Sequence, residues 1–177
     1  MYQINLYNNK QKMKRFLVFQ FIVILIFIVL SYKWSMSLTL LHEQNIGMNI
    51  FLGVSGFIIL EIVHELVKVL ILRMITNRHQ AFHRYQNGVL ITYLPHYYFN
   101  RITFFLYTLL PGIILMLLLL IWFTLMPYSS IIFIFALHMA YLSIPIYFVA
   151  VGLSKTHVQF VEMTESGINL YQEKPTI

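Results

Sequence analysis

Residues Ile50 to Leu72 read IFLGVSGFIILEIVHELVKVLIL, a run that is long and apolar enough to cross a bilayer as one helix but that holds four ionisable side chains. These side chains are Glu61, His64, Glu65 and Lys68. In a helix that turns about 100° per residue, they lie at about 0°, −60°, +40° and −20° relative to Glu61, so one face carries all of them. We call this face the polar stripe. A charged side chain at the centre of a bilayer costs about 2.5 to 3.5 kcal/mol, so we expect the stripe to face other helices and not lipid.

The composition is typical of a membrane protein. Hydrophobic residues make up 59% of the 177 residues and charged residues only 10%, which excludes an ordinary soluble domain. Three further apolar runs are long enough to span a bilayer, at residues 16–32, 102–126 and 131–153. Together with residues 50–72 they predict an all-α membrane protein, with four transmembrane helices in a single integral membrane domain over residues 1–177. The first run is similar to a signal peptide, but Ser35-Met36-Ser37 is a poor cleavage site, so we expect the run to remain as the first helix.

The basic residues predict how these helices are oriented. Lys33 lies on one side of the expected membrane and Lys68 lies inside the second helix, whereas the other ten of the twelve Lys and Arg residues lie on the opposite side. These ten are Lys10, Lys12, Lys14, Arg15, Arg73, Arg78, Arg84, Arg101, Lys155 and Lys174. The positive-inside rule therefore places both termini in the cytoplasm and the protein in the cytoplasmic membrane. Because the basic residues flank apolar runs, we expect the lipid bilayer and no nucleic acid as a partner.

Two short β-hairpins are expected on the cytoplasmic side. Residues 79–94 contain Asn87-Gly88 between two alternating segments, which is a strong signal for a tight turn. Residues 157–172 show the same alternation on either side of Glu165-Ser166-Gly167. The two hairpins could pair into one small sheet. An interfacial aromatic belt beside Arg101 is expected from Tyr93, Tyr97, Tyr98 and Phe99.

Cysteine and aspartate are both absent from the sequence. Their absence excludes disulfides, a cysteine nucleophile, a serine triad completed by aspartate and the paired aspartates of some intramembrane proteases. Carboxylate chemistry in this chain must therefore use glutamate.

The stripe contains an incomplete metal-binding motif. His64-Glu65-x-x-Lys68 differs by one residue from H-E-x-x-H, in which two histidines four positions apart hold zinc and the glutamate polarises water. Lys68 replaces the second histidine, and an ammonium group has no lone pair to offer a metal. One interpretation is a charge network without metal, in which Lys68 neutralises Glu61 or Glu65 and His64 lies hydrogen-bonded between them.

The stripe, the Pro111-Gly112 break in the next helix, the hairpin between these helices and the short tail together resemble the zincin peptidases found among small bacterial multipass membrane proteins. The resemblance covers residues 50–171. It implies that His64 is a metal ligand and that Glu65 is the catalytic general base. It also implies an acidic third ligand to zinc in the last membrane helix.

This chain departs from that pattern in two places. Lys68 stands where the second histidine belongs, and the last helix offers Ser143, Tyr147 and His138 in place of an aspartate. The resemblance therefore implies a degenerate site without zinc. We expect such a protein to bind or regulate another membrane protein or a peptide, and not to cut it.

A rebuilt metal site is the main alternative. Glu61 and His64 form a Glu-x-x-His pair, which could join His138 from the last helix to give an active zinc metallopeptidase with unusual ligands. Counted from the outer ends of the expected helices, His64 is 14 residues deep, or about 21 Å, and His138 is 7 residues deep, or about 10 Å. This difference predicts that His138 lies nearer the outer surface of the membrane than the stripe does. Ser143 and Tyr147 are expected to lie nearer the level of the stripe.

Two further functions stay open. Gly53-Val-Ser55-Gly56 matches the nucleophile motif of rhomboid-type serine proteases, and Ser55 lies near the depth of His138. Gly-x-x-Gly within a span is, however, ordinarily a helix-packing surface. A small transporter or immunity-type membrane protein, with the stripe lining a polar path, would also explain the buried charge.

Reporter fusions test the predicted topology. A reporter inserted after Thr156 or within residues 86–88 should report the cytoplasm, and one within residues 35–44 should report the outside, because of the bias in basic residues. The measurement is the activity of paired reporters that work on opposite sides of the membrane. An external signal from the insertion at Asn87-Gly88 would contradict the four-helix topology.

Overall fold

The computed structural model describes residues 2–38, 41–76, 81–86 and 89–175. Within these residues it contains four helices, α1 (Lys10–Leu38), α2 (Ile46–Thr76), α3 (Arg101–Leu125) and α4 (Ser129–Ser154). Six strands accompany them, β1 (Tyr2–Ile4), β2 (Phe82–Gln86), β3 (Val89–Tyr93), β4 (Tyr98–Asn100), β5 (Phe160–Thr164) and β6 (Gly167–Tyr171). All four expected helices are present, and each is long and apolar enough to cross a membrane.

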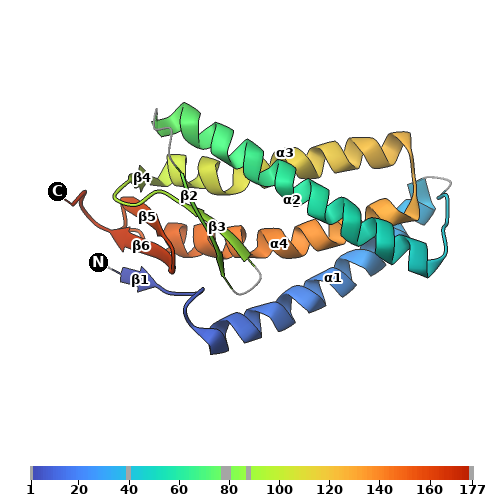
Figure 1. Ribbon diagram of the computed structural model, residues 1–177, viewed down its shortest axis with the longest axis horizontal. Coiled ribbons are helices and arrows are strands. Elements are labelled where there is room, and N and C mark those ends of the chain that lie inside the picture. The colour runs from blue at the N-terminus through green and yellow to red at the C-terminus, as the bar shows by residue number, and fades with distance from the viewer. Residues whose placement is uncertain (1, 39–40, 77–80, 87–88, 176–177) are drawn as a thin grey trace.

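Helix α4 lies at the centre of the bundle, and the other three helices pack against it (Figure 1). Glycine allows α2 to approach α4 closely. A Cβ atom at Gly53 would lie 2.5 Å from Phe133 Cβ, and one at Gly56 would lie 2.4 Å from Ile134 Cδ1. The Gly-x-x-Gly motif is therefore a helix-packing surface, which is its ordinary role in a membrane helix.

Helix α1 packs on α4 through an aromatic pair and one polar contact. The rings of Phe16 and Tyr147 meet edge-on with centroids 5.9 Å apart. Gln20, a polar residue within the first apolar run, donates from Nε2 to the carbonyl oxygen of Ala140 at 2.9 Å. The amide of Gln20 is thus paired with α4, which removes the cost of exposing it to lipid.

A four-stranded antiparallel sheet, in the order β1-β6-β5-β4, lies at the end of the bundle where both ends of the described chain are found (Figure 1). Its β5–β6 hairpin confirms the prediction for residues 157–172. Strands β1 and β4 have three residues each, too few for an alternating pattern to be recognised in the sequence. Tyr2 in β1 pairs with Leu170 in β6, so both ends of the described chain lie on the same side of the bundle.

Strands β2 and β3 form a separate two-stranded sheet. They pair from Phe82↔Tyr93 to Gln86↔Val89, which confirms a hairpin within residues 79–94. The Asn87-Gly88 turn of the prediction lies outside the described residues. The two hairpins belong to different sheets, so the suggestion that they share one sheet is wrong.

The β2–β3 hairpin lies alongside the helices and not beyond their ends. Strand β3 buries Val89, Ile91 and Thr92, whereas β2 is largely exposed. Thr92 reaches Glu65, which is eleven residues before the end of α2. The buried side of β3 therefore brings the hairpin next to the polar stripe.

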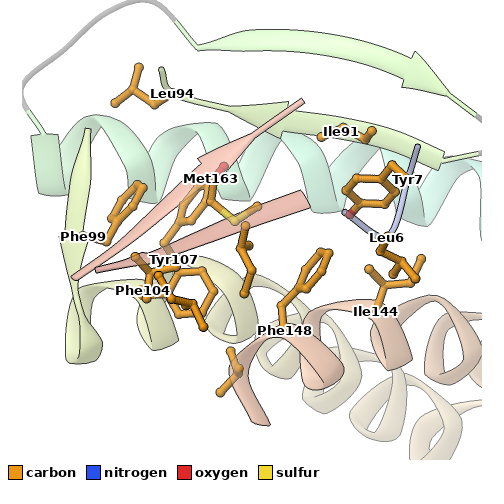
Figure 2. Packing of buried hydrophobic residues seen from close by; sticks show 14 of the residues in the cluster. Leu6, Tyr7, Ile91, Leu94, Phe99, Phe104, Tyr107, Ile144, Phe148 and Met163 are labelled. Carbon is orange, nitrogen blue, oxygen red and sulfur yellow. The ribbon is translucent and has the colours of Figure 1, made fainter. Parts of the chain in front are cut away.

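The main hydrophobic core lies between the two sheets and the adjoining parts of α3 and α4 (Figure 2). Phe99 of β4 is fully buried and stacks on Tyr107 of α3, with ring centroids 5.1 Å apart. Phe99 is thus a core residue and not part of an interfacial belt. Tyr7, which precedes α1, meets Phe148 of α4 edge-on at 5.6 Å. This core holds the N-terminal segment and both sheets beside the stripe.

Candidate functional site

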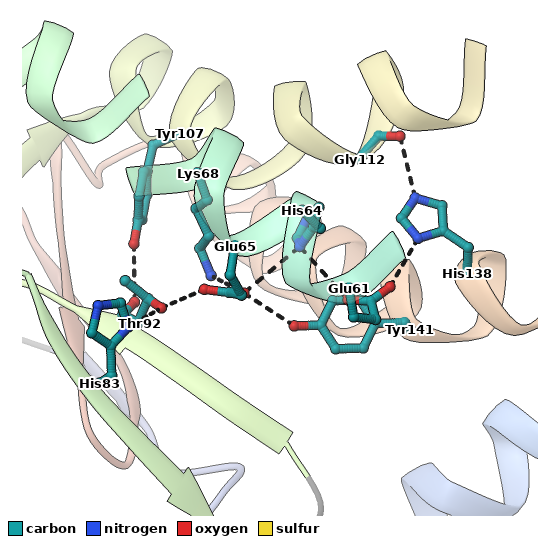
Figure 3. Close-up of polar contacts among 10 residues, drawn as sticks. All are labelled: Glu61, His64, Glu65, Lys68, His83, Thr92, Tyr107, Gly112, His138 and Tyr141. Atoms are coloured by element: carbon teal, nitrogen blue, oxygen red, sulfur yellow. Dashed lines mark hydrogen bonds and ion pairs between the residues drawn. The ribbon is translucent and has the colours of Figure 1, made fainter. Parts of the chain in front are cut away.

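The polar stripe is buried where α2 meets α3, α4 and β3 (Figure 3). His64 is 1% exposed, Glu65 8% and Lys68 9%, and the side chain of Glu61 is 16% exposed. Ile59 and Leu66, on other faces of the same helix, are exposed. Helix α2 therefore turns its ionisable side chains inward, as the cost of placing charge in lipid requires.

Glu65 is held by two other elements. Thr92 Oγ1 on β3 donates to Glu65 Oε2 at 2.5 Å, and the hydroxyl of Tyr141 on α4 donates to Glu65 Oε1 at 3.3 Å. Because the Thr92 hydroxyl proton is used in this way, Thr92 Oγ1 accepts from His83 Nδ1 on β2, which lies 3.0 Å away. Tyr107 fixes Thr92 further by donating to its backbone carbonyl at 3.0 Å. Both oxygens of the Glu65 carboxylate are thus engaged.

Lys68 lies against the same carboxylate. Its Nζ atom is 3.5 Å from Glu65 Oε1 and 5.6 Å from the centre of the Tyr107 ring. The ammonium therefore lies one helical turn after His64, at the position that the second histidine occupies in H-E-x-x-H. Burial raises the pKa of Tyr7, and the negative charge of Glu65 adds to this effect, so Tyr7 stays neutral beside the stripe.

Glu61 meets a histidine from α4. Glu61 Oε1 lies 3.0 Å from His138 Nδ1, and His138 Nε2 lies 3.4 Å from the carbonyl oxygen of Gly112 in α3. Since a carbonyl oxygen only accepts, His138 Nε2 carries a proton. Helices α3 and α4 are close at this point, since a Cβ atom on Gly112 would lie 2.2 Å from Leu142 Cδ2 and would displace that side chain. Glu61 and His138 therefore join three helices at one point.

The predicted difference in depth between His64 and His138 is wrong, because their ring centroids are 5.8 Å apart. The estimate assumed that the outer ends of α2 and α4 lie level. Helix α2 instead starts earlier than expected and runs obliquely across α4, with Gly53 against Phe133 (Figure 1). This offset brings Glu61 to the level of His138.

His64 lies between the two carboxylates without a hydrogen bond to either. Its Nδ1 atom is 3.7 Å from Glu61 Oε2 and 3.6 Å from Glu65 Oε1, beyond the usual hydrogen-bond distance. The ring packs edge-on against Tyr141, with centroids 5.4 Å apart. In the part of the chain that the structure describes, neither ring nitrogen of His64 has a hydrogen-bond partner, and Glu61 Oε2 has none. The centre of the stripe thus holds buried polar atoms that remain unpaired.

Ser143 and Tyr147, the other residues expected to oppose the stripe, make contacts elsewhere. Ser143 Oγ donates to the carbonyl oxygen of Ala140 in its own helix at 2.5 Å. The Tyr147 ring packs against Phe16 of α1. Of the three residues proposed from the last helix, His138 is the one that these contacts bring to the stripe.

The contacts of His138 do not favour a serine–histidine dyad with Ser55. The two ring nitrogens of His138 face Glu61 and the Gly112 carbonyl. A histidine that activates a serine must direct one nitrogen at the hydroxyl. The glycines beside Ser55 instead serve the packing of α2 on α4.

Sequence reasoning missed Thr92, Tyr141 and the Gly112 carbonyl as members of the site. Tyr141 follows His138 by three positions, so both share one face of α4, and this spacing is a signal that could have been used. Thr92 gives no comparable signal, because its contact with Glu65 depends on how the hairpin packs against α2. Every residue has a backbone carbonyl, so the sequence does not indicate that the carbonyl of Gly112 belongs to the site.

A lateral cleft of about 430 Å³ opens beside the two carboxylates. Glu61 and Glu65 form its acidic part. The remaining lining comes from α2, the β2–β3 hairpin and α4, as Phe57, Ile58, Ile62, Tyr85, Leu90 and Tyr141. A cleft of this size, with mostly apolar walls and few polar groups, is typical of a binding site.

The stripe lacks one ligand of an H-E-x-x-H zinc site. Catalytic zinc normally takes three protein ligands, and the ammonium of Lys68 cannot be one. Among residues 2–38, 41–76, 81–86 and 89–175, no group of three or more His, Asp or Glu side chains is arranged to hold a metal ion. Glu61 and His138 contact each other directly, through the carboxylate and imidazole groups that such a site would need as metal ligands.

Comparison with known proteins identifies no family. No protein-family model matches the chain, and neither any curated protein nor any solved structure matches it. The resemblance to zincin peptidases therefore rests on the residues of this chain alone.

Replacement of Lys68 tests the buried ion pair. Lys68→Ala should lower the free energy of unfolding by about 3–5 kcal/mol, because Glu65 would stay buried without its cation. Combining Lys68→Ala with Glu65→Gln should recover part of this loss. The measurement is denaturant unfolding of the purified protein in detergent micelles, followed by circular dichroism.

Arg84→Ala provides the matched control, because the ion pair between Arg84 and Glu165 is about half exposed. This change should cost less than about 1 kcal/mol. A double variant of Lys68 and Glu65 that is no more stable than Lys68→Ala would contradict the pairing.

Proposed function

We propose that this protein is a membrane protein of zincin-peptidase ancestry that no longer cuts peptides and instead binds an apolar segment of another membrane protein or a membrane peptide. The observation that carries the proposal is the 3.5 Å contact between Lys68 Nζ and Glu65 Oε1. Lys68 supplies a positive charge where a zinc enzyme needs a ligand. A general base also needs a free oxygen to take a proton from water, and both oxygens of Glu65 are engaged.

The lateral cleft supports a partner with an apolar body and one hydrogen-bond donor. Ile58 and Ile62 on α2 and Leu90 on β3 offer apolar surface to such a body. Glu61 lines the same cleft and its side chain is 16% exposed, so its carboxylate can accept from the donor. A transmembrane segment with one polar residue has this chemistry, since polar side chains commonly hydrogen-bond between membrane helices.

The packing of α2 on α4 supports binding over transport through the bundle. Away from the sheets, the two helices meet at Gly53 and Phe133, where even a Cβ atom on the glycine would be 2.5 Å from its neighbour. Close packing of this kind leaves no room for a polar path between these helices at that level. The stripe is then a polar wall of the cleft and not the lining of a channel.

The proposal places the protein in the cytoplasmic membrane with both termini in the cytoplasm. The bias of basic residues supports this orientation. The pairing of Tyr2 with Leu170 is consistent with it, because both strands must lie on the same side of the bundle. In this orientation the cleft opens sideways from α2, whose neighbouring residues Ile59 and Leu66 are exposed. A partner in the bilayer can therefore reach the cleft laterally.

Zinc content tests the loss of the metal site. We expect the purified native protein to hold far less than stoichiometric zinc. Lys68→His restores H-E-x-x-H from His64 and should raise zinc affinity, and adding Tyr141→Asp should raise it further because position 141 lies on the face of α4 that contacts the stripe. The measurement is elemental analysis before and after chelation.

The control for the third ligand is Ser143→Asp in the Lys68→His background. Ser143 donates to its own helix, so Asp at this position should add less affinity than Asp at 141. Stoichiometric zinc in the native protein, lost on Glu61→Gln or His64→Ala, would overturn the non-catalytic proposal.

Photocrosslinking from the cleft tests the binding function. A photoreactive residue at Ile58 should form discrete adducts with one membrane protein or peptide in cells, because Ile58 lines the cleft. The matched control is Ile59, which is adjacent, similarly exposed and outside the cleft lining. Leu90→Trp, which fills the cleft, should abolish the adduct from Ile58. Equal labelling from both positions would contradict the proposal, and a partner recovered as fragments that depend on Glu65 would indicate a peptidase.

A further inference from the structure

Among the described residues, two buried polar atoms on neighbouring helices have no hydrogen-bond partner. They are His64 Nε2 on α2 and Thr108 Oγ1 on α3, and neither has a hydrogen bond among the described residues. Both residues are almost completely buried. A buried donor or acceptor left unpaired costs about 1–3 kcal/mol, and such atoms nearly always have a partner in folded proteins. Their positions therefore indicate a ligand that is not part of the chain.

His64 and Thr108 line the same small cavity, which has a volume of about 20 Å³. Lys68 lines it as well, and the hydrophobic lining includes Ile144 and Phe148. A water molecule needs a cavity of about 10–15 Å³ and two to four polar partners. The cavity meets both conditions for one water molecule and is too small for an organic ligand. It adjoins the lateral cleft, with which it shares Leu90 and Tyr141, but Thr108, His64 and Lys68 line only the cavity.

We propose that this cavity binds a single water molecule that bridges His64 Nε2, Thr108 Oγ1 and the ammonium group of Lys68. The ammonium only donates, the hydroxyl donates and accepts, and the imidazole nitrogen does either. Water can complement all three, because it both accepts and donates two hydrogen bonds. An anion of similar size would add negative charge beside the carboxylates of Glu61 and Glu65, so the neutral ligand is favoured.

The water gives His64 the contacts that its surroundings lack. The Nδ1 atom lies 3.6 and 3.7 Å from the two carboxylates, and His64 also lines the cavity. A hydrogen bond from the cavity side fixes the ring plane and links α2 to α3 through Thr108. The water site is not part of the proposed partner-binding function, so a failure of one proposal does not disprove the other.

Substitution of Thr108 tests the proposal, because a bridging water predicts that the protein loses stability when the hydroxyl is removed. If water bridges the two helices, Thr108→Val removes one partner of the water and should lower the equilibrium constant for folding about tenfold. Thr108→Ser keeps the hydroxyl and should retain most of the native stability. Thr124→Val is the matched control on α3, since the Thr124 hydroxyl donates within its own helix. A Thr108→Val protein as stable as the native one, or more stable, would overturn the proposal, because a methyl group would then replace a hydroxyl that had no partner.

A second measurement detects the water directly in the native protein. The protein is produced with ¹⁵N-labelled histidine and placed in membranes. Nuclear magnetic resonance should then show magnetisation transfer between a long-lived water molecule and the His64 ring. The Thr108→Val substitution should remove this transfer. Absence of this transfer in the native protein would overturn the proposal. Replacement of chloride by a large organic anion should leave the unfolding midpoint unchanged. A chloride-dependent midpoint that Thr108→Val abolishes would identify an anion in place of water and would also overturn it.

Discussion

The ion pair between Glu65 and Lys68 is the interaction on which the rest of this structure depends. Two opposite charges within an apolar helix can be tolerated only when they neutralise each other and find hydrogen-bond partners outside that helix. Glu65 obtains these partners from Thr92 on β3 and Tyr141 on α4. The site therefore requires the hairpin to pack beside α2 and requires α4 to lie at the centre of the bundle.

The contacts of three glycines show how closely the helices must pack to form this site. Gly53 and Gly56 set the position of α2 along α4, and Gly112 sets the approach of α3 to α4. With these contacts in place, His138 lies within 3.0 Å of Glu61 and near the Gly112 carbonyl. A Cβ atom at Gly53 would lie 2.5 Å from Phe133 Cβ, so a larger residue there would push α2 away from α4. Residues that bear no functional group thus determine the geometry of the site.

The sequence was sufficient to predict the four helices, both hairpins and the inward direction of the stripe. These features depend on local periodicity and on the cost of burying charge, which one segment reveals by itself. The partners of the stripe depend on the register between elements. Counting residues from the helix ends placed Ser143 near the stripe and His138 outside it, whereas the crossing of α2 over α4 brings His138 to Glu61, and the Ser143 hydroxyl donates within its own helix. The role of Thr92 depends in the same way on the packing of a hairpin whose position no local pattern encodes.

The pairing of β1 with β6 constrains the order in which the protein can assemble. Ser166 Oγ donates to Asn5 Oδ1 at 3.0 Å, a contact between residues 161 positions apart. Contacts of such long range form late, because loop closure costs entropy before any contact stabilises the fold. During synthesis β1 emerges long before β6, so the sheet can close only after all four helices have been made. Tyr7, which lies between β1 and α1, and Met163 of β5 both line the cavity beside Lys68, so this wall of the site is completed only when β5 has followed the fourth helix. A nascent chain therefore has its helices in place while one side of the stripe is still uncovered.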